Sequence, residues 1–197
     1  QGMAAPAPPR SALGRFVGLE RLLAIDMGAR HSGLAVRTSP LLGVQRYGVL
    51  ERQHVVRSRL NQVPPRGGSW SWALKPERHT GSRPSRFTSQ AAALWSLIDG
   101  LRIDGVVIGM PYLADGERSR ECDIVEAVVA GLQRSWPCDV PILMWDESFS
   151  TRFALGPGRH SAKQLAWGHA AVACQLLAEV LHAKHQLEVM DNGKLAR

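Results

Sequence analysis

The sequence lacks long apolar segments, has few cysteines and, in its first half, has few acidic residues. No run approaches the 18 consecutive apolar residues of a membrane-spanning helix, which excludes a membrane channel. The three cysteines, Cys122, Cys138 and Cys174, form no CxxC pair and are odd in number. This excludes a disulfide-stapled module, and the seven scattered histidines complete no zinc template. A reducing compartment is the simplest interpretation.

The shortage of acids is confined to one half of the chain. Residues 1–90 contain 14 Lys and Arg but only four acids, whereas residues 91–197 contain 10 Lys and Arg and 13 acids. The formal net charge of the 197 residues is +7, and the basic excess is mostly arginine, whose planar fork suits phosphate. We therefore expect a nucleic acid to bind the basic side. The alternative is a solvated basic surface that aids import into an organelle.

Composition and length indicate one globular domain. Hydrophobic residues are 45% and charged residues 21% of the chain, which is enough apolar material for a core. We predict a domain over residues 19–187 with an insertion over 51–87, a flexible tail over 1–18 and a C-terminal tail over 188–197. The first tail has arginines and no acid, as in an organelle transit segment, or it is simply disordered. We expect the mitochondrial matrix, with plastid or cytoplasm as alternatives.

Hydrophobic patterning predicts an α/β fold. Short apolar runs and helical spacings alternate in a consistent order along the chain. The expected strands are 21–26, 33–38, 46–50, 104–109 and 140–146, and the expected helices are 88–101, 117–134 and 161–185. Three strands in quick succession, followed by βα units, predict a mixed five-stranded sheet with helices on both faces.

The predicted insertion interrupts this pattern with prolines, glycines, arginines and two tryptophans. Arginines with interleaved aromatics suit neutralisation of a nucleic-acid backbone and stacking on its bases. The alternatives are that the tryptophans anchor a protein partner, or that the segment is a linker. The candidate nucleic-acid-binding residues here are Arg52, Arg57, Arg59, Arg66, Trp70, Trp72, Lys75, Arg78, Arg83 and Arg86.

Acidic residues end two of the expected strands. Asp26 ends the first, and Asp146 and Glu147 end the last. Ligands of open α/β sheets bind beyond the carboxyl ends of strands, and clustered carboxylates repel unless a cation neutralises them. Mg²⁺ is the natural occupant, and two such ions can clamp a phosphodiester. The alternative is that each acid merely caps the following turn. Gly28 permits a tight turn there, and Arg30 is placed to meet a phosphate.

Together these motifs resemble one family. Asp26-x-Gly28-x-Arg30-x-x-Gly33-x-Ala35, Gly109-x-Pro111-x-x-x-Asp115-Gly116, Asp146-Glu147-x-Phe149-Ser150-Thr151 and Lys163 follow in the order and spacing of the YqgF (RuvX) family, relatives of Holliday-junction resolvases. The resemblance implies an RNase H-like fold and activity on structured nucleic acid. Bacterial members are associated with trimming ribosomal RNA precursors, and some with branched DNA. The family's acids fall on Asp26, Asp146 and Glu147, which would hold Mg²⁺ or Mn²⁺.

Two positions depart from the family pattern. The arginine that usually follows the Asp-Glu pair is Ser148 here, although Arg152 lies one helical turn later. The family's last acid falls on His169, which can coordinate a metal or move a proton but is a poor Mg²⁺ ligand. A second basic loop holds Arg159, which could close over a substrate.

These observations predict an organellar protein that binds structured RNA, most simply ribosomal RNA. It would act as a divergent metal-dependent nuclease in ribosomal RNA maturation, with Asp26, Asp146, Glu147 and His169 as catalytic candidates. The second hypothesis is a structural component of a ribosome, built on a degenerate site. Two further alternatives are an active resolvase of branched DNA and a non-catalytic subunit of another mitochondrial complex, which would use the fold and the insertion for protein contacts.

Overall fold

The computed structural model describes residues 10–28, 31–51, 71–72, 86–113, 115–136, 140–147 and 161–195. The strands are β1 (Leu22–Met27), β2 (His31–Arg37), β3 (Gln45–Glu51), β4 (Ser71–Trp72), β5 (Gly105–Met110) and β6 (Ile142–Asp146). The helices are α1 (Arg10–Gly14), α2 (Arg86–Leu101), α3 (Arg120–Ser135) and α5 (Ala162–Leu195). Each predicted strand and helix is therefore present, with shifts of a few residues at most ends.

The strands form one mixed sheet in the order β4-β3-β2-β1-β5-β6. β1 pairs antiparallel with β2, and β2 with β3, whereas β1, β5 and β6 run parallel. The predicted mixed sheet, with three antiparallel strands followed by βα units, is confirmed. The two-residue strand β4 adds a sixth strand parallel to β3, inside the segment predicted as an insertion.

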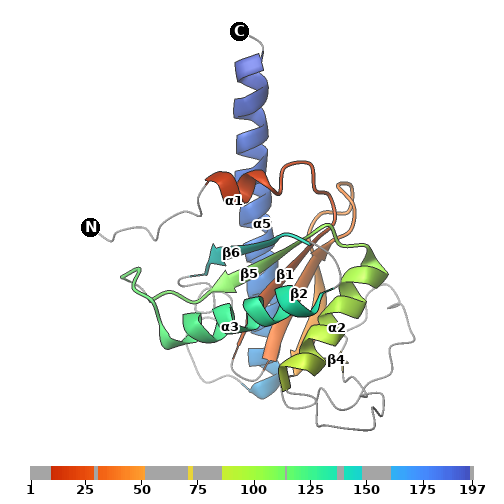
Figure 1. Ribbon diagram of the computed structural model, residues 1–197. Coiled ribbons are helices and arrows are strands. Elements are labelled where there is room, and N and C mark those ends of the chain that lie inside the picture. The colour runs from red at the N-terminus through yellow and green to blue at the C-terminus, as the bar shows by residue number, and fades with distance from the viewer. Residues whose placement is uncertain are drawn as a thin grey trace.

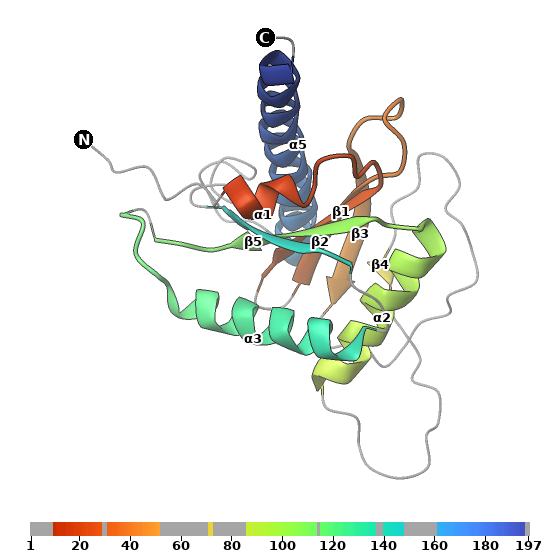
Figure 2. The same ribbon diagram turned by 45° about the horizontal axis from the view of Figure 1, so that its top comes forward.

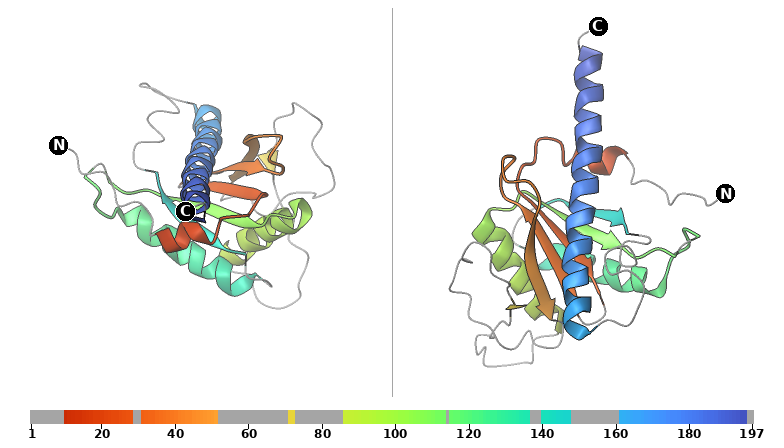
Figure 3. Two further views of the ribbon diagram at one scale, coloured as in Figure 1. Left: turned by 90° about the horizontal axis from the view of Figure 1, so that it is seen from above. Right: turned by 180° about the vertical axis from the view of Figure 1, so that it is seen from behind.

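Helices cover both faces of the sheet, as predicted. α2 and α3 lie on one face, and α5 crosses the other (Figure 2, Figure 3). Successive side chains of β1 point to opposite faces of the sheet and contribute to both core layers. Leu23 and Ile25 pack on the α2 and α3 side, whereas Leu22 and Ala24 pack on the α1 and α5 side. All four side chains are essentially fully buried, which explains the uninterrupted apolar run of this strand.

α5 begins at a reciprocal cap and is longer than predicted. The Ser161 hydroxyl accepts from the Gln164 N–H at 3.2 Å, and the Gln164 side chain accepts from the Ser161 N–H at 2.8 Å. The helix continues past the predicted end at residue 185 to Leu195, so its last turns project beyond the sheet (Figure 1). The predicted C-terminal tail is thus helical over 188–195, because no glycine or proline interrupts the helix before Gly193.

The predicted N-terminal tail also contains packed structure. Residues 10–14 form α1, and Leu13 and Phe16 are buried at 7% and 1% exposure in a core cluster with side chains of β1, β5 and α5. The arginine, alanine and glycine around these two residues obscured their spacing in the sequence. Residues 1–9 lie outside the described residues, as does most of the insertion. Within the described ranges, no helix combines the length and apolar character needed to cross a bilayer.

We expect Phe16→Ala to lower the free energy of unfolding by about 3–5 kcal/mol, because it leaves a cavity in the core cluster that β1, β5 and α5 share with this segment. Val17→Ala is the matched control: its side chain is 40% exposed, so a change within about 0.5 kcal/mol is expected. Urea unfolding measures both. Equal, small effects would show that this segment does not pack on the domain.

Candidate active site

The carboxyl ends of β1, β5 and β6 meet at one edge of the sheet. Asp26 follows Ile25, which pairs with Ile108, so Asp26 lies level with Gly109 of β5. Beyond the end of β6, the Glu147 N–H donates to the Met110 carbonyl at 3.1 Å and extends the pairing with β5. The acids at the ends of β1 and β6 therefore flank β5. The sequence indicated an acid at each of these strand ends, and the strand order shows that they lie at the same edge.

The pleat of β6 determines which acid faces Asp26. Leu143 packs on the α5 side, and the Trp145 indole donates to Glu179 of α5 at 3.0 Å. Side chains alternate along a strand, so Glu147 also faces α5, whereas Asp146 faces the α3 side. Asp26 faces α5, two residues after Ala24. The structure thus brings Glu147 to Asp26 and places Asp146 on the opposite face.

His169 of α5 completes this group. Its Nδ1 lies 2.7 Å from the Asp26 Oδ2, and the side chains of Asp26 and His169 are 2% and 18% exposed. The structure therefore places His169 beside the first acid, at the position that the family resemblance assigns to the last acid.

Three glycines make room for these side chains. A Cβ on Gly33, which pairs with Asp26, would overlap the backbone of His169 and Ala170, so α5 lies directly against β2. A Cβ on Gly28 would overlap the His169 ring, and one on Gly109 would overlap the Glu147 carboxylate. All three glycines belong to the motifs noted in the sequence. The sequence did not reveal that they make room for α5, His169 and Glu147, because these residues are distant in the chain.

The carboxylates of Asp26 and Glu147 interact strongly. Burial, the charge of Asp26 and a hydrogen bond with Asp26 raise the pKa of Glu147 to about 9, and the charge of Asp146 adds to this. Near neutral pH, Glu147 therefore holds a proton beside Asp26, while His169 contacts the same aspartate.

The donor set fits one hard divalent ion better than an enclosed metal centre. Asp26 and Glu147 offer carboxylate oxygens, and Mg²⁺ is commonly held by one or two carboxylates together with substrate phosphates. The third member, His169, offers a nitrogen that Mg²⁺ binds poorly. Among the described residues, no three His, Cys, Asp or Glu side chains are grouped so that they alone could hold a metal ion.

The basic candidates fall mostly outside the described residues. Arg30, Arg152 and Arg159 lie there, as do Arg52, Arg57, Arg59, Arg66, Trp70, Lys75, Arg78 and Arg83. Trp72 lies in β4, and Arg86 begins α2. The role of these residues in binding stays a prediction.

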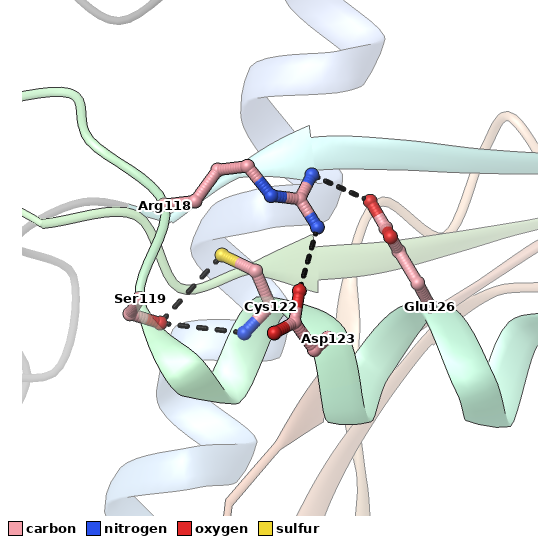
Figure 4. Close-up of polar contacts among 5 residues, drawn as sticks. All are labelled: Arg118, Ser119, Cys122, Asp123 and Glu126. Carbon is pink, nitrogen blue, oxygen red and sulfur yellow. Dashed lines mark hydrogen bonds and ion pairs between the residues drawn. The ribbon is translucent and has the colours of Figure 1, made fainter.

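The loop between β5 and α3 also borders the edge, which sequence reasoning noted only as part of a motif. Arg118 at its end donates to Glu126 at 2.8 Å and to Asp123 at 3.0 Å (Figure 4). Ser119 caps α3 by accepting from the Cys122 N–H at 3.3 Å. The alternation of charges over residues 118–126 was the available signal. The loop is thereby anchored to the first turns of α3.

We expect Glu147→Gln to change how stability depends on pH. The pKa of Glu147 is raised from about 4.5 when folded, so the unfolded chain releases the proton first, and stability falls as pH rises from about 4.5 to 9. The free energy of unfolding of Glu147→Gln should therefore rise relative to that of wild type as the pH increases from about 4.5 to 9. Urea unfolding at several pH values without divalent ions measures it, with the exposed Glu121→Gln as control. Parallel curves for wild type and Glu147→Gln would contradict the raised pKa.

Gly33→Ala should destabilise the domain by about 1–3 kcal/mol or more, because α5 backbone cannot yield as a side chain would. Gly131→Ala, on α3 with open space around it, should be stabilising by about 0.5–1 kcal/mol. Thermal unfolding compares the two variants. A neutral Gly33→Ala would mean that α5 lies further from β2.

Comparisons with known proteins agree with this architecture. A family model described as RuvX, Holliday junction resolvase, matches residues 75–183. A protein of Phenylobacterium zucineum named "Putative pre-16S rRNA nuclease" is 39% identical over 69 residues, which cover 35% of this chain and 44% of that protein. A protein of the same name from Roseobacter denitrificans is 36% identical over 66 residues, covering 34% and 40%. The chain therefore matches less than half the length of these relatives.

The chain also shows a distant likeness to solved structures. RuvC of T. thermophilus in complex with a Holliday junction substrate superposes with a TM-score of 0.42 at 14% identity, over 85% of this chain and 94% of that one. The yeast mitochondrial Holliday junction resolvase Ydc2 gives a TM-score of 0.38 at 9% identity, over 92% and 91%. The family model spans more than half of the chain, and the predicted RNase H-like fold class is confirmed. The chain belongs to the RuvX (YqgF) family.

Proposed function

We propose that this protein is a divergent metal-dependent nuclease that hydrolyses phosphodiester bonds in structured RNA, with a ribosomal RNA precursor as its substrate. The observation that carries the proposal is the contact between Asp26 and Glu147 at the carboxyl edge of the parallel strands. Two touching carboxylic groups are costly to bury, and a divalent cation is the partner that would make both charges favourable. RNA is favoured by the net charge of +7 and by the names of the bacterial relatives.

The described residues have separate tasks in this proposal. Asp26 and Glu147 would hold the cation once Glu147 releases its proton. When bound, Mg²⁺ or Mn²⁺ would supply positive charge for the phosphate oxygens of the substrate. His169 orients Asp26 through Nδ1, Gly28 leaves room for the His169 ring, and Gly109 leaves room for the Glu147 carboxylate. Asp146, on the far face, is a weaker ligand candidate than Glu147.

A second candidate function is RNA binding without cleavage. It is favoured by His169, which replaces a carboxylate with an imidazole and satisfies Asp26 from within the protein. The protein would then be a structural component of an organellar ribosome, or a subunit of another mitochondrial complex that uses the fold for protein contacts. The mitochondrial location belongs to the same proposal and rests on the acid-free, arginine-containing residues 1–18. Branched DNA is the alternative substrate, in keeping with the description of the family.

The deciding experiment is a cleavage assay on a ribosomal RNA precursor and a four-way DNA junction, with Mg²⁺ or Mn²⁺. We expect cleavage of the RNA, and a loss of at least about 100-fold in Asp26→Asn, because the variant removes a charge that would hold the cation. Asp99→Asn, an exposed residue of α2, is the matched control and should cleave like wild type.

The other outcomes choose between the alternatives. No cleavage, together with RNA binding that weakens steeply as salt rises, would reject the nuclease and leave the binding protein. Cleavage of the junction alone would establish a resolvase. Absence of salt-dependent binding to either nucleic acid would reject the RNA nuclease, the RNA-binding protein and the DNA resolvase, and would favour a role in protein contacts.

A further inference from the structure

Trp145 of β6 lies on the same face of the sheet as Asp26 and Glu147. Its indole N–H donates to Glu179 of α5 at 3.0 Å, and its ring packs against the core cluster on the α5 side. Trp145 precedes Glu147 by two residues, and side chains two apart along a strand point to the same face. Trp145 is thus the aromatic residue of β6 on the face that carries the acid pair.

The register of the three parallel strands aligns the indole with this pair. Trp145 pairs with Gly109 of β5, and Asp26 of β1 lies level with Gly109 from the other side. A Cβ on Gly109 would overlap the Glu147 carboxylate, so this carboxylate lies over Gly109, on the α5 side. One row across β1, β5 and β6 therefore carries Asp26, the Glu147 carboxylate and Trp145, on strands about 4.8 Å apart.

The indole is held in place but is not fully buried. α5 packs mainly over β2, β1 and β3, and β6 lies to one side of it when the sheet is seen from behind (Figure 3). The Trp145 side chain is partly exposed. Its acceptor, Glu179, also accepts from the Gln175 side-chain amide at 3.0 Å, which fixes that carboxylate on α5. A ring oriented in advance loses little conformational entropy when it meets a ligand.

The groups beside the ring favour an uncharged ligand. Glu179 takes up the indole N–H, so the exposed part of the ring offers aromatic surface rather than a hydrogen-bond donor. Glu179 is itself an exposed acid and would repel a phosphate at this point. A nucleobase carries no charge, and its flat face stacks on aromatic side chains.

We propose that Trp145 stacks on an unpaired base that adjoins the phosphate on which Asp26 and Glu147 act. This inference rests on the proposed function and specifies its substrate as RNA that is single-stranded beside the cleaved bond. A base that is still paired within a helix has both faces covered by its neighbours and cannot lie on the indole. Aromatic stacking tolerates any base, so this contact selects unpaired RNA without selecting sequence.

The first test compares two fluorescein-labelled RNAs by anisotropy: a blunt hairpin and the same hairpin with a single-stranded 5′ flank. Buffer free of divalent ions keeps both intact. We expect wild type to prefer the flanked RNA, and Trp145→Ala to weaken binding to it by about 5- to 150-fold, the range found for loss of one stacked base. Met144→Ala is the matched control. It truncates a residue of the same strand, 42% exposed on the opposite face, and should bind like wild type.

Tryptophan emission reports the contact directly, because a base stacked on an indole quenches its fluorescence. Trp145→Phe keeps an aromatic ring, so it should retain the preference for the flanked RNA. It should also lose the share of the quenching by this RNA that Trp145 contributes among the six tryptophans. This variant decides the question alone if circular dichroism shows that Trp145→Ala is not folded.

Three results would overturn the inference: equal binding of both RNAs by wild type, an unchanged preference in folded Trp145→Ala, or quenching in Trp145→Phe equal to that in wild type. Trp145→Ala should also leave the slope of log Kd against log salt unchanged, because a stacked base releases no counterions. A slope lowered by about one would place a phosphate there instead. Absence of binding to either RNA is a different result, which overturns the proposed function itself.

Discussion

The close approach of α5 to β2 at Gly33 is the constraint on which the candidate site depends. Gly33 lies opposite Asp26 in the β1–β2 pair, and any side chain there would meet the backbone of α5. At this separation, the Nδ1 of His169 lies 2.7 Å from the Asp26 carboxylate. The rest of α5 is fixed by its buried stripe, which includes Ala173, Leu177 and Val180, so the helix has little freedom to move away. Packing at one glycine thus sets the geometry of a buried polar cluster.

In that cluster, the burial of two adjacent carboxyl groups, those of Asp26 and Glu147, is electrostatically unfavourable. The Glu147 carboxyl group does not face water. It occupies the space beside Gly109, next to Asp26. The result is a protonated acid at neutral pH, with its pKa near 9. Buried groups whose pKa is shifted this far are concentrated at functional sites. The same arrangement that destabilises the ionised pair without a cation is the one that would favour cation binding.

The sequence was sufficient to predict the layers of the fold, because β1, β5 and the amphipathic helices carry clear periodicities. It also indicated that acids follow two of the strands, but whether these acids meet depends on the strand order, which places β5 between β1 and β6. It could not choose between Asp146 and Glu147, because the choice depends on the pleat of β6 relative to α5. Nor did it reveal α1, the buried Phe16 that follows α1, or the part of α5 beyond residue 185. The packing of the N-terminal segment depends on contacts with residues far away in the chain. Lys184 donates to the Leu19 carbonyl, a contact 165 residues apart in the chain.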